Sequence, residues 1–195
     1  MTFEPELWLV IPDDLPFDLP RIVAALDRCG VRYVLVGGMC GTLHGMVDYR
    51  TQDVDLLVQE NADNLDRLAM ALTALGAVPS RTTDRRPITG SDLAGTSTQW
   101  DTDAGQVDVL VSAAWPNESI VIYADIHRRA ELFDAGGVTV PAASLDDVIR
   151  MKEAADRYKD HLALPELRRL RGDRYPELRT DQDPFGDFDI EDGAE

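Results

Sequence analysis

Two aspartates, Asp53 and Asp55, stand one residue apart in a segment that otherwise reads as a buried strand, Asp-Val-Asp-Leu-Leu-Val. Side chains at positions i and i+2 of a strand point to the same face, so the two carboxylates are expected to be neighbours. Adjacent carboxylates repel, and each raises the pKa of the other. A divalent cation removes this penalty, and Mg²⁺ prefers hard oxygen ligands. The pair therefore predicts a metal site on one face of a sheet.

A third carboxylate belongs to a second apolar strand further along the chain. Asp108 stands in the segment Gln-Val-Asp-Val-Leu-Val, at 106–111. If this strand lies beside 53–59, three acids converge on one sheet face, and the metal site has three candidate ligands. Two simpler readings stay open: solvent-facing acids at a strand end for the pair, and an ordinary hairpin acid for Asp108.

A glycine pair, Gly37-Gly38, separates the predicted strand at 31–36 from a short predicted helix at 39–44. Glycine lets a backbone approach a ligand closely, and the N–H groups at a helix start can bind phosphate oxygens. A tight turn explains the pair equally well. The surrounding residues form neither a P-loop nor the G-x-G-x-x-G pattern of dinucleotide-binding folds.

Helices and strands are predicted to alternate along the chain. Helix ends are indicated by Pro20 and Gly30 around one segment, by Asn61 as a cap, and by Ser144 with Asp147 as a capping box. Helices are expected at 20–29, 39–44, 62–75 and 124–131, from Ser144 past Tyr158, and from Pro165 to about Gly172. Strands are expected at 31–36, 53–59 and 119–123, with hairpins at 97–112 and 132–140 and a long loop at 79–97.

Charge is distributed unevenly along the 195 residues, whose formal net charge is −17. The tail at 181–195 holds seven acids and no base, so the rest of the chain carries −10. Residues 150–179 hold nine Lys or Arg against six Asp or Glu, a local excess of three positive charges. Phosphate contacts need Lys and Arg, so a nucleic-acid contact is expected only from this basic segment, which can equally be a solvated helix face.

Four regions follow from these patterns. We expect an irregular N-terminal segment at 1–16, a core at 17–142, a C-terminal helical segment at 143–175, and an acidic, disordered tail at 176–195.

The cellular compartment is predicted from the cysteines and from the apolar runs. Cys29 and Cys40 do not form a disulfide framework, which favours a reducing compartment. No apolar run approaches the roughly 18 residues of a membrane helix, and no targeting segment is recognisable. A cytoplasmic protein without a membrane partner is expected.

The glycine pair and the aspartates together resemble a known fold. The segments Leu-Val-Gly-Gly at 35–38, Leu-His-Gly at 43–45 and Arg-Thr-Gln-Asp-Val-Asp-Leu-Leu-Val at 50–58 are similar to the nucleotidyltransferase fold of the DNA polymerase β superfamily. Its pattern is an apolar residue, Gly, then Gly or Ser, a spacer, Asp-x-Asp, and a third acid on a later strand. The resemblance implies an α/β (α+β) fold with a mixed sheet flanked by helices and a C-terminal helical segment.

The helix predicted at 151–167 resembles one in bacterial nucleotidyltransferase toxins of the AbiE/MenT type. In that group a helix after the core carries a Lys and an Arg-x-Lys-Asp motif. Four positions of this chain match: Lys152, Arg157, Lys159 and Asp160. The spacing of Lys152, Asp156 and Asp160 further predicts that these three share one helix face. An exposed stripe of ion pairs is the alternative.

The resemblance implies transfer of a nucleoside monophosphate from an NTP to a hydroxyl, with Mg²⁺, or Mn²⁺, as cofactor. Two metals can stabilise both the entering and the leaving oxygen. The site implied by the resemblance has metal ligands Asp53, Asp55 and Asp108, triphosphate contacts from Gly37 and Gly38, and a phosphate-neutralising Lys152 beside Asp160. Arg50 and Thr51 are expected either to line the nucleotide site or to stabilise the turn before the strand.

The acceptor is the least constrained part of the prediction. The resemblance favours RNA, with tRNA 3′ ends as the best guess, and a toxin with a possible cognate antitoxin. An acidic surface also suits a protein acceptor, and a non-catalytic antitoxin or binding module can keep the same fold. Gly38 stands where many antibiotic-modifying relatives have Ser, which argues modestly against a drug substrate.

Overall fold

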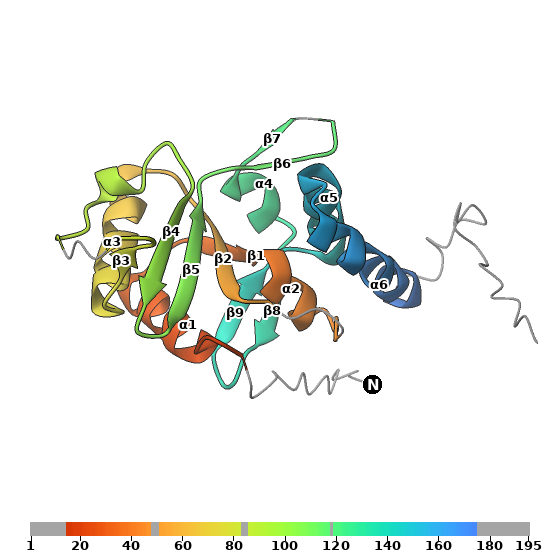
Figure 1. The fold of residues 1–195 in the computed structure, drawn as a ribbon, viewed down its shortest axis with the longest axis horizontal. Helices are drawn as coiled ribbons and strands as arrows, with labels where there is room; N and C mark the ends of the chain where they lie inside the picture. The colour runs from red at the N-terminus through yellow and green to blue at the C-terminus, as the bar shows by residue number, and fades with distance from the viewer. Residues whose placement is uncertain (1–14, 48–50, 83–85, 118, 175–195) are drawn as a thin grey trace, which may run out of the picture.

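A seven-stranded mixed sheet forms the centre of the computed structural model, which describes residues 15–47, 51–82, 86–117 and 119–174 (Figure 1). The strand order is β3-β4-β5-β2-β1-β9-β8. Helices flank this sheet, so the predicted fold class is confirmed. The predicted acidic tail, Arg50 and nearly all of the predicted N-terminal segment lie outside the described residues.

The elements of the fold have the following bounds. The strands of the main sheet are β1 (Tyr33–Val36), β2 (Asp53–Val58), β3 (Val78–Pro79), β4 (Thr98–Thr102), β5 (Gly105–Leu110), β8 (Glu131–Asp134) and β9 (Thr139–Ala142). A separate two-stranded sheet consists of β6 (Ala113–Ala114) and β7 (Ile120–Val121). The helices are α1 (Leu19–Cys29), α2 (Gly37–Leu43), α3 (Ala62–Ala74), α4 (Tyr123–His127), α5 (Leu145–Ala155) and α6 (Tyr158–Arg174), with a 3-10 turn η1 at Gly90–Asp92.

Local sequence signals explain several of these boundaries. Asp18 caps α1 by accepting a hydrogen bond from the Arg21 N–H at 3.0 Å, and Gly30 ends the helix in the left-handed region at φ 66°. Asn61 caps α3 in the same way, by accepting from the Asn64 N–H at 2.9 Å. The predicted cap Asn61 is therefore confirmed for α3, whereas α1, predicted to start at Pro20, begins one residue earlier, after the cap Asp18.

The register of the sheet brings the acids together. Strand β2 runs parallel to β5, with Asp55 opposite Asp108, and antiparallel to β1, with Asp55 opposite Val36. Val54 and Leu56 point to the other face of β2 and are fully buried in the main core. The aspartates thus share one face because the apolar residues between them fill the core behind it.

Helix α2 is fixed to the junction between β9 and α5. His44 Nε2 lies 2.8 Å from the Ala143 carbonyl oxygen, and the Cys40 thiol donates to the same oxygen at 3.3 Å. The His44 ring also packs edge-on against Phe133, with ring centroids 4.9 Å apart. Both Cys40 and His44 are therefore structural residues that tie α2 to the start of the C-terminal helices.

The prediction for the C-terminal helices was wrong in its boundaries. The helix that begins after Ser144 does not run past Tyr158 but ends at Ala155, where Asp156 adopts a left-handed conformation at φ 48°. Pro165 does not start a helix either, because it lies inside α6. Proline removes one helical N–H donor, yet Leu164 and Leu167 on either side are buried, so tertiary packing outweighs this local cost.

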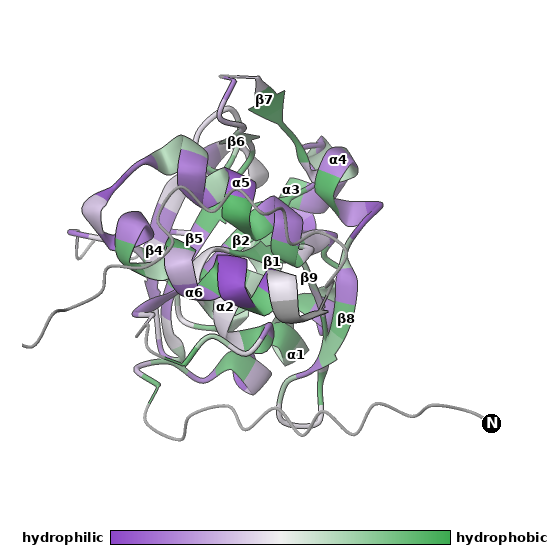
Figure 2. Cartoon of the chain, turned by 90° about the vertical axis from the view of Figure 1, so that its right-hand side faces the viewer, coloured by the Kyte–Doolittle hydropathy of each residue, from purple (hydrophilic) through white to green (hydrophobic). Residues whose placement is uncertain are grey.

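Helices α5 and α6 contact each other, and α5 also contacts α2. Figure 2 shows hydrophilic segments alternating with apolar ones on the outward side of α5 and α6, in front of the apolar strands β1 and β2. None of the helices among the described residues is both long and apolar enough to cross a bilayer.

Candidate active site

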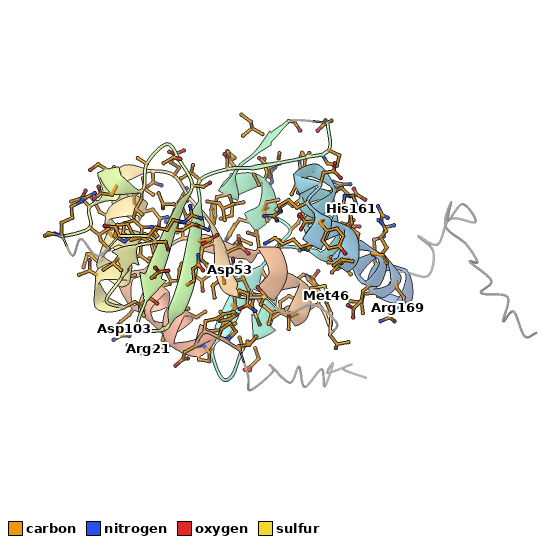
Figure 3. The ribbon with its side chains drawn as sticks, viewed as in Figure 1. Arg21, Met46, Asp53, Asp103, His161 and Arg169 are labelled. Carbon is orange, nitrogen blue, oxygen red and sulfur yellow. The ribbon has the colours of Figure 1, made fainter. Side chains whose placement is uncertain are left out.

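Three carboxylates meet on one face of the sheet. Oxygen atoms of Asp53 and Asp55 on β2 and of Asp108 on β5 all lie within 4.8 Å of one another. Figure 3 labels Asp53 at the start of β2, between β5 and α2. Three converging carboxylates are a donor set that hard divalent cations prefer. The predicted convergence is therefore confirmed, and the cluster can hold a divalent metal ion.

Asp55 is the most perturbed member of the cluster. Burial, followed by the negative charges of Asp53 and Asp108, raises the pKa of Asp55 to about 7. The positive charge of Lys159 and a hydrogen bond from the Gly38 N–H act in the opposite direction. The site thus carries negative charge that neighbouring protein groups do not fully neutralise, which is the condition that favours a bound cation.

Amide side chains orient Asp108. The Gln99 side chain on β4 donates to one carboxylate oxygen at 2.9 Å, and the Gln106 side chain donates to the other at 3.5 Å. Burial raises the pKa of Asp108, while the hydrogen bond from Gln99 lowers it. Asp108 is therefore held in a fixed orientation beside the two acids of β2.

Thr51 supports Asp53 from behind. Its hydroxyl donates to the Asp53 carbonyl oxygen at 3.1 Å and lies 3.4 Å from a carboxylate oxygen of the same residue. Thr51 is buried and does not line the cleft beside the acids. Of the two roles expected for Thr51, these contacts favour stabilisation of the turn.

Gly37 allows α2 to approach Asp55. Its φ of 68° is a left-handed conformation that side chains disfavour, and a Cβ atom at this position would overlap the Asp55 carboxylate. Gly38 follows as a buried residue at the start of α2. The glycine pair is thus required where the backbone passes directly over the acids.

A cleft of about 270 Å³ opens between the acids and the C-terminal helices. Its sheet side includes Gly37, Gly38, Asp53 and Asp55, and apolar side chains line its interior. Its cationic lining residues, Lys152, Arg157 and Lys159, all come from α5, α6 and the turn between them. The cleft therefore places carboxylates opposite basic side chains, an arrangement suited to a phosphate ligand with a bound metal.

A second depression, of about 400 Å³, lies at the start of α3 and shares no lining residue with the cleft beside the acids. It is lined by Arg32, Gln59, Asn61, Ala62, Asp63, Asn64 and Arg67. None of the residues predicted for the active site lines it, so the smaller cleft is the candidate active site.

Lys152 and Asp160 meet, although not for the predicted reason. They do not share one helix face, because the chain breaks at Asp156 between them. Instead, the turn folds α6 back onto α5, and the Lys152 ammonium donates to an Asp160 oxygen at 3.1 Å. Arg157 donates to the other oxygen at 2.7 Å. Burial opposes ionisation of Asp160, but these two cations outweigh it and lower its pKa.

Lys159 is a cleft residue that the predicted site did not include. It lines the cleft with an exposed side chain, and its charge acts on the carboxyls of both Asp55 and Asp108. The signal for it was present in the Arg-x-Lys-Asp motif, but locating it required the helix break at Asp156. Arg50 cannot be placed, because it lies outside the described residues.

The sequence matches no protein family and no curated protein. The structure, in contrast, is similar to solved structures of nucleotide-transferring enzymes. One is the lincosamide antibiotic adenylyltransferase LnuA bound to lincomycin, with 14% identity, 79% of this chain and 98% of that chain covered, and a TM-score of 0.53. Another is the antibiotic-resistance factor ANT(2″)-Ia in complex with adenylyl-2″-tobramycin, with 17% identity, 80% and 86% coverage, and a TM-score of 0.50.

At this level of identity the likeness concerns the fold. The chain has the nucleotidyltransferase fold that the glycine pair and the aspartates predicted. The finer resemblance to AbiE/MenT-type toxins stays a prediction, because no comparison supports it.

Proposed function

We propose that this protein is a metal-dependent nucleotidyltransferase that transfers a nucleoside monophosphate from an NTP to a hydroxyl group and releases pyrophosphate. The observation that carries the proposal is the cluster of Asp53, Asp55 and Asp108, with carboxylate oxygens within 4.8 Å of one another. Two of these acids, Asp53 and Asp55, line a cleft that cationic side chains also line. Carboxylate oxygens suit Mg²⁺ or Mn²⁺. The similarity of fold to two nucleotide-transferring enzymes supports the same class of reaction.

Each residue of the cluster has a proposed role. Asp53 and Asp55 would hold the metal, which would stabilise the charge on the entering hydroxyl oxygen and on the leaving pyrophosphate oxygen. Asp108 also binds metal, and its fixed orientation beside Gln99 suits it to accept the proton of the attacking hydroxyl. Thr51 keeps Asp53 in place.

The glycine turn and Lys152 complete the proposed nucleotide site. The backbone at Gly37 and Gly38 lines the cleft with no side chain in the way, so the triphosphate can approach it closely. Lys152 contributes positive charge at the same cleft, and Asp160 holds that charge in position. Arg50, which precedes β2 in the sequence and lies outside the described residues, remains a predicted nucleotide contact.

For the acceptor we propose an RNA 3′ end, with tRNA as the best candidate and a toxin role with a cognate antitoxin as the biological setting. All cationic side chains that line the cleft come from the basic C-terminal helices, which favours an anionic acceptor over a polycation. A protein acceptor, a small-molecule acceptor of the kind that LnuA and ANT(2″)-Ia bind, and a non-catalytic antitoxin are the competing outcomes.

Transfer of label tests this proposal directly. The purified chain is incubated with Mg²⁺ or Mn²⁺ and each α-labelled NTP in turn, with total RNA, lysate protein, lincomycin or tobramycin as acceptor. Asp55→Asn removes one metal ligand with little change of shape, and Asp66→Asn, at an exposed position of α3, is the matched control.

Each outcome of this experiment has a distinct meaning. Label in a tRNA-sized band with wild-type and Asp66→Asn protein, absent with Asp55→Asn, supports the proposed RNA enzyme. Label on protein or antibiotic keeps the reaction and replaces the acceptor. No Asp55-dependent label on any acceptor contradicts the enzyme and favours the binding module.

A further inference from the structure

The chain contains only two lysines, and both line the cleft. Lys152 belongs to α5 and Lys159 to α6, whereas all other basic side chains apart from histidine are arginines. An ammonium group is a compact charge that binds phosphate oxygens as a point charge, and it is not interchangeable with a planar guanidinium. The two lysines are therefore the natural candidates for binding phosphate groups, but they have different surroundings.

Lys152 is engaged inside the protein. Its side chain is 6% exposed, and its ammonium group lies 3.1 Å from Asp160, whose side chain is 0% exposed. A phosphate that recruited this ammonium would have to draw it away from a buried carboxylate. Removing one partner of a buried ion pair leaves the other uncompensated, which is strongly unfavourable.

Asp160 joins the two C-terminal helices. It accepts from Lys152 on α5 and from Arg157 in the turn, while its own backbone belongs to α6. The turn itself is unusual, because Asp156 holds a left-handed conformation at φ 48°. These contacts fix where the first turn of α6 begins, and therefore the direction in which its first side chains point.

Lys159 precedes Asp160 in that first turn and has an exposed side chain. It lines the same cleft as Gly37, Gly38 and Asp55, and it forms no ion pair with any described residue. Asp53 and Asp55, two of the three acids, line this cleft together with Lys159. Lys159 is thus the cation of the cleft that can turn to a ligand without breaking a buried contact.

We propose that Lys159 binds the phosphate groups of the nucleotide, and that Lys152 and Asp160 are positioning residues that hold Lys159 over the cleft. This inference rests on the proposed function. It assigns phosphate binding to Lys159 and a positioning role to Lys152 with Asp160. The ligand is a nucleoside triphosphate with its divalent metal, bound between Lys159 and the three acids.

Chemical modification of the two lysines tests the assignment in the full-length protein. Inorganic triphosphate with Mg²⁺ is the probe, so the identity of the base does not matter. Amine acetylation followed by mass spectrometry is expected to modify Lys159 faster than Lys152. Triphosphate at about ten times its Kd should then slow the acetylation of Lys159 about tenfold and leave the acetylation rate of Lys152 unchanged. Protection of Lys152 alone, or of neither lysine by a bound probe, would overturn the assignment.

Calorimetry of variants provides a second test. Lys159→Ala is expected to weaken triphosphate binding about tenfold or more, and Lys159→Arg to recover part of this loss because it restores the charge. Both variants should melt like wild type, because the side chain is exposed. Unchanged affinity of Lys159→Ala would contradict the proposal.

The positioning role needs a variant that keeps the fold. Lys152→Met combined with Asp160→Leu removes both buried charges together, which can leave stability nearly unchanged. Positioning predicts a melting temperature near that of wild type but a triphosphate affinity several-fold lower. A double variant with both the melting temperature and the triphosphate affinity of wild type would show that the pair is merely structural and would overturn this part of the proposal.

The same measurements separate failure of the inference from failure of the proposed function. A wild-type chain that binds no triphosphate with Mg²⁺ contradicts both. Binding that does not depend on Lys159, together with nucleotide transfer, contradicts only the inference. Binding that depends on Lys159 without any transfer contradicts only the proposed reaction.

Discussion

Replacing Asp55 by Asn should stabilise the metal-free protein at alkaline pH. The pKa of Asp55 rises from 3.8 to about 7 in the folded chain, first because of burial and then because of Asp53 and Asp108. A raised pKa means that the folded state holds the proton more tightly than the unfolded state does. The stabilising contribution of this proton is complete below pH 3.8 and is lost as the pH rises through about 7.

The size of this effect follows from the shift. About three pKa units correspond to about 4 kcal/mol, of which about 2–3 kcal/mol is lost between about pH 5 and pH 8. Asn has no proton to lose, so the stability of Asp55→Asn relative to wild type should grow by that amount over this range. For a chain of this size, about 2–3 kcal/mol corresponds to roughly 4–12 °C in Tm.

Thermal melting in EDTA at about pH 5 and pH 8 measures the difference in Tm between Asp55→Asn and wild type. Asp66→Asn is a control that should follow wild type. Adding Mg²⁺ at pH 8 should raise the Tm of wild type and leave that of Asp55→Asn almost unchanged, because the variant lacks a metal ligand. A gap between variant and wild type that is the same at both pH values would refute the electrostatic argument.

Two further substitutions test how the site is built. Gly37→Ala should destabilise the protein by about 2 kcal/mol or more and abolish the Mg²⁺-dependent rise in Tm, because the added Cβ overlaps the Asp55 carboxylate. Gly45 is also at positive φ, but the nearest atom to an added Cβ lies 3.7 Å away. Gly45→Ala should therefore lose only the stability that the backbone strain costs, and should keep the response to Mg²⁺. Equal behaviour of the two variants would argue against the overlap. Gln99→Leu removes the hydrogen bond that lowers the pKa of Asp108. The acidic limb of the pH–rate profile for nucleotide transfer should therefore move to higher pH, and an unmoved limb would argue against an ionised Asp108 in the reaction.

The sequence was most informative where signals are local. Pro20 located the start of α1 to within one residue, Asn61 located the start of α3, and β-branched or apolar content indicated β1 and β2. The convergence of Asp53, Asp55 and Asp108 followed from one added assumption, that two apolar strands lie side by side. That assumption was sound because both strands must bury their apolar face in the same core.

The C-terminal helices were mispredicted because tertiary contacts decide their boundaries. Asp156 is not a residue that marks a helix end as glycine does, yet its left-handed conformation ends α5. Pro165 is a strong local signal for a helix start, yet packing of Leu164 and Leu167 carries α6 through it. No periodicity reveals that Lys152 and Asp160 meet across this turn, and the role inferred for Lys159 depends on it.

The carbonyl of Ala143 receives both His44 and Cys40 at the point where the sheet gives way to α5. These two hydrogen bonds link α2, which begins at the glycine pair on one side of the cleft, to the start of α5 on the other side. Such a link is expected to keep the cleft in one shape when it is empty. The protein therefore loses little conformational entropy when a ligand binds in this preformed cleft. Weakening this link, for example by His44→Ala, should then weaken ligand binding chiefly through a less favourable entropy, although His44 does not line the cleft.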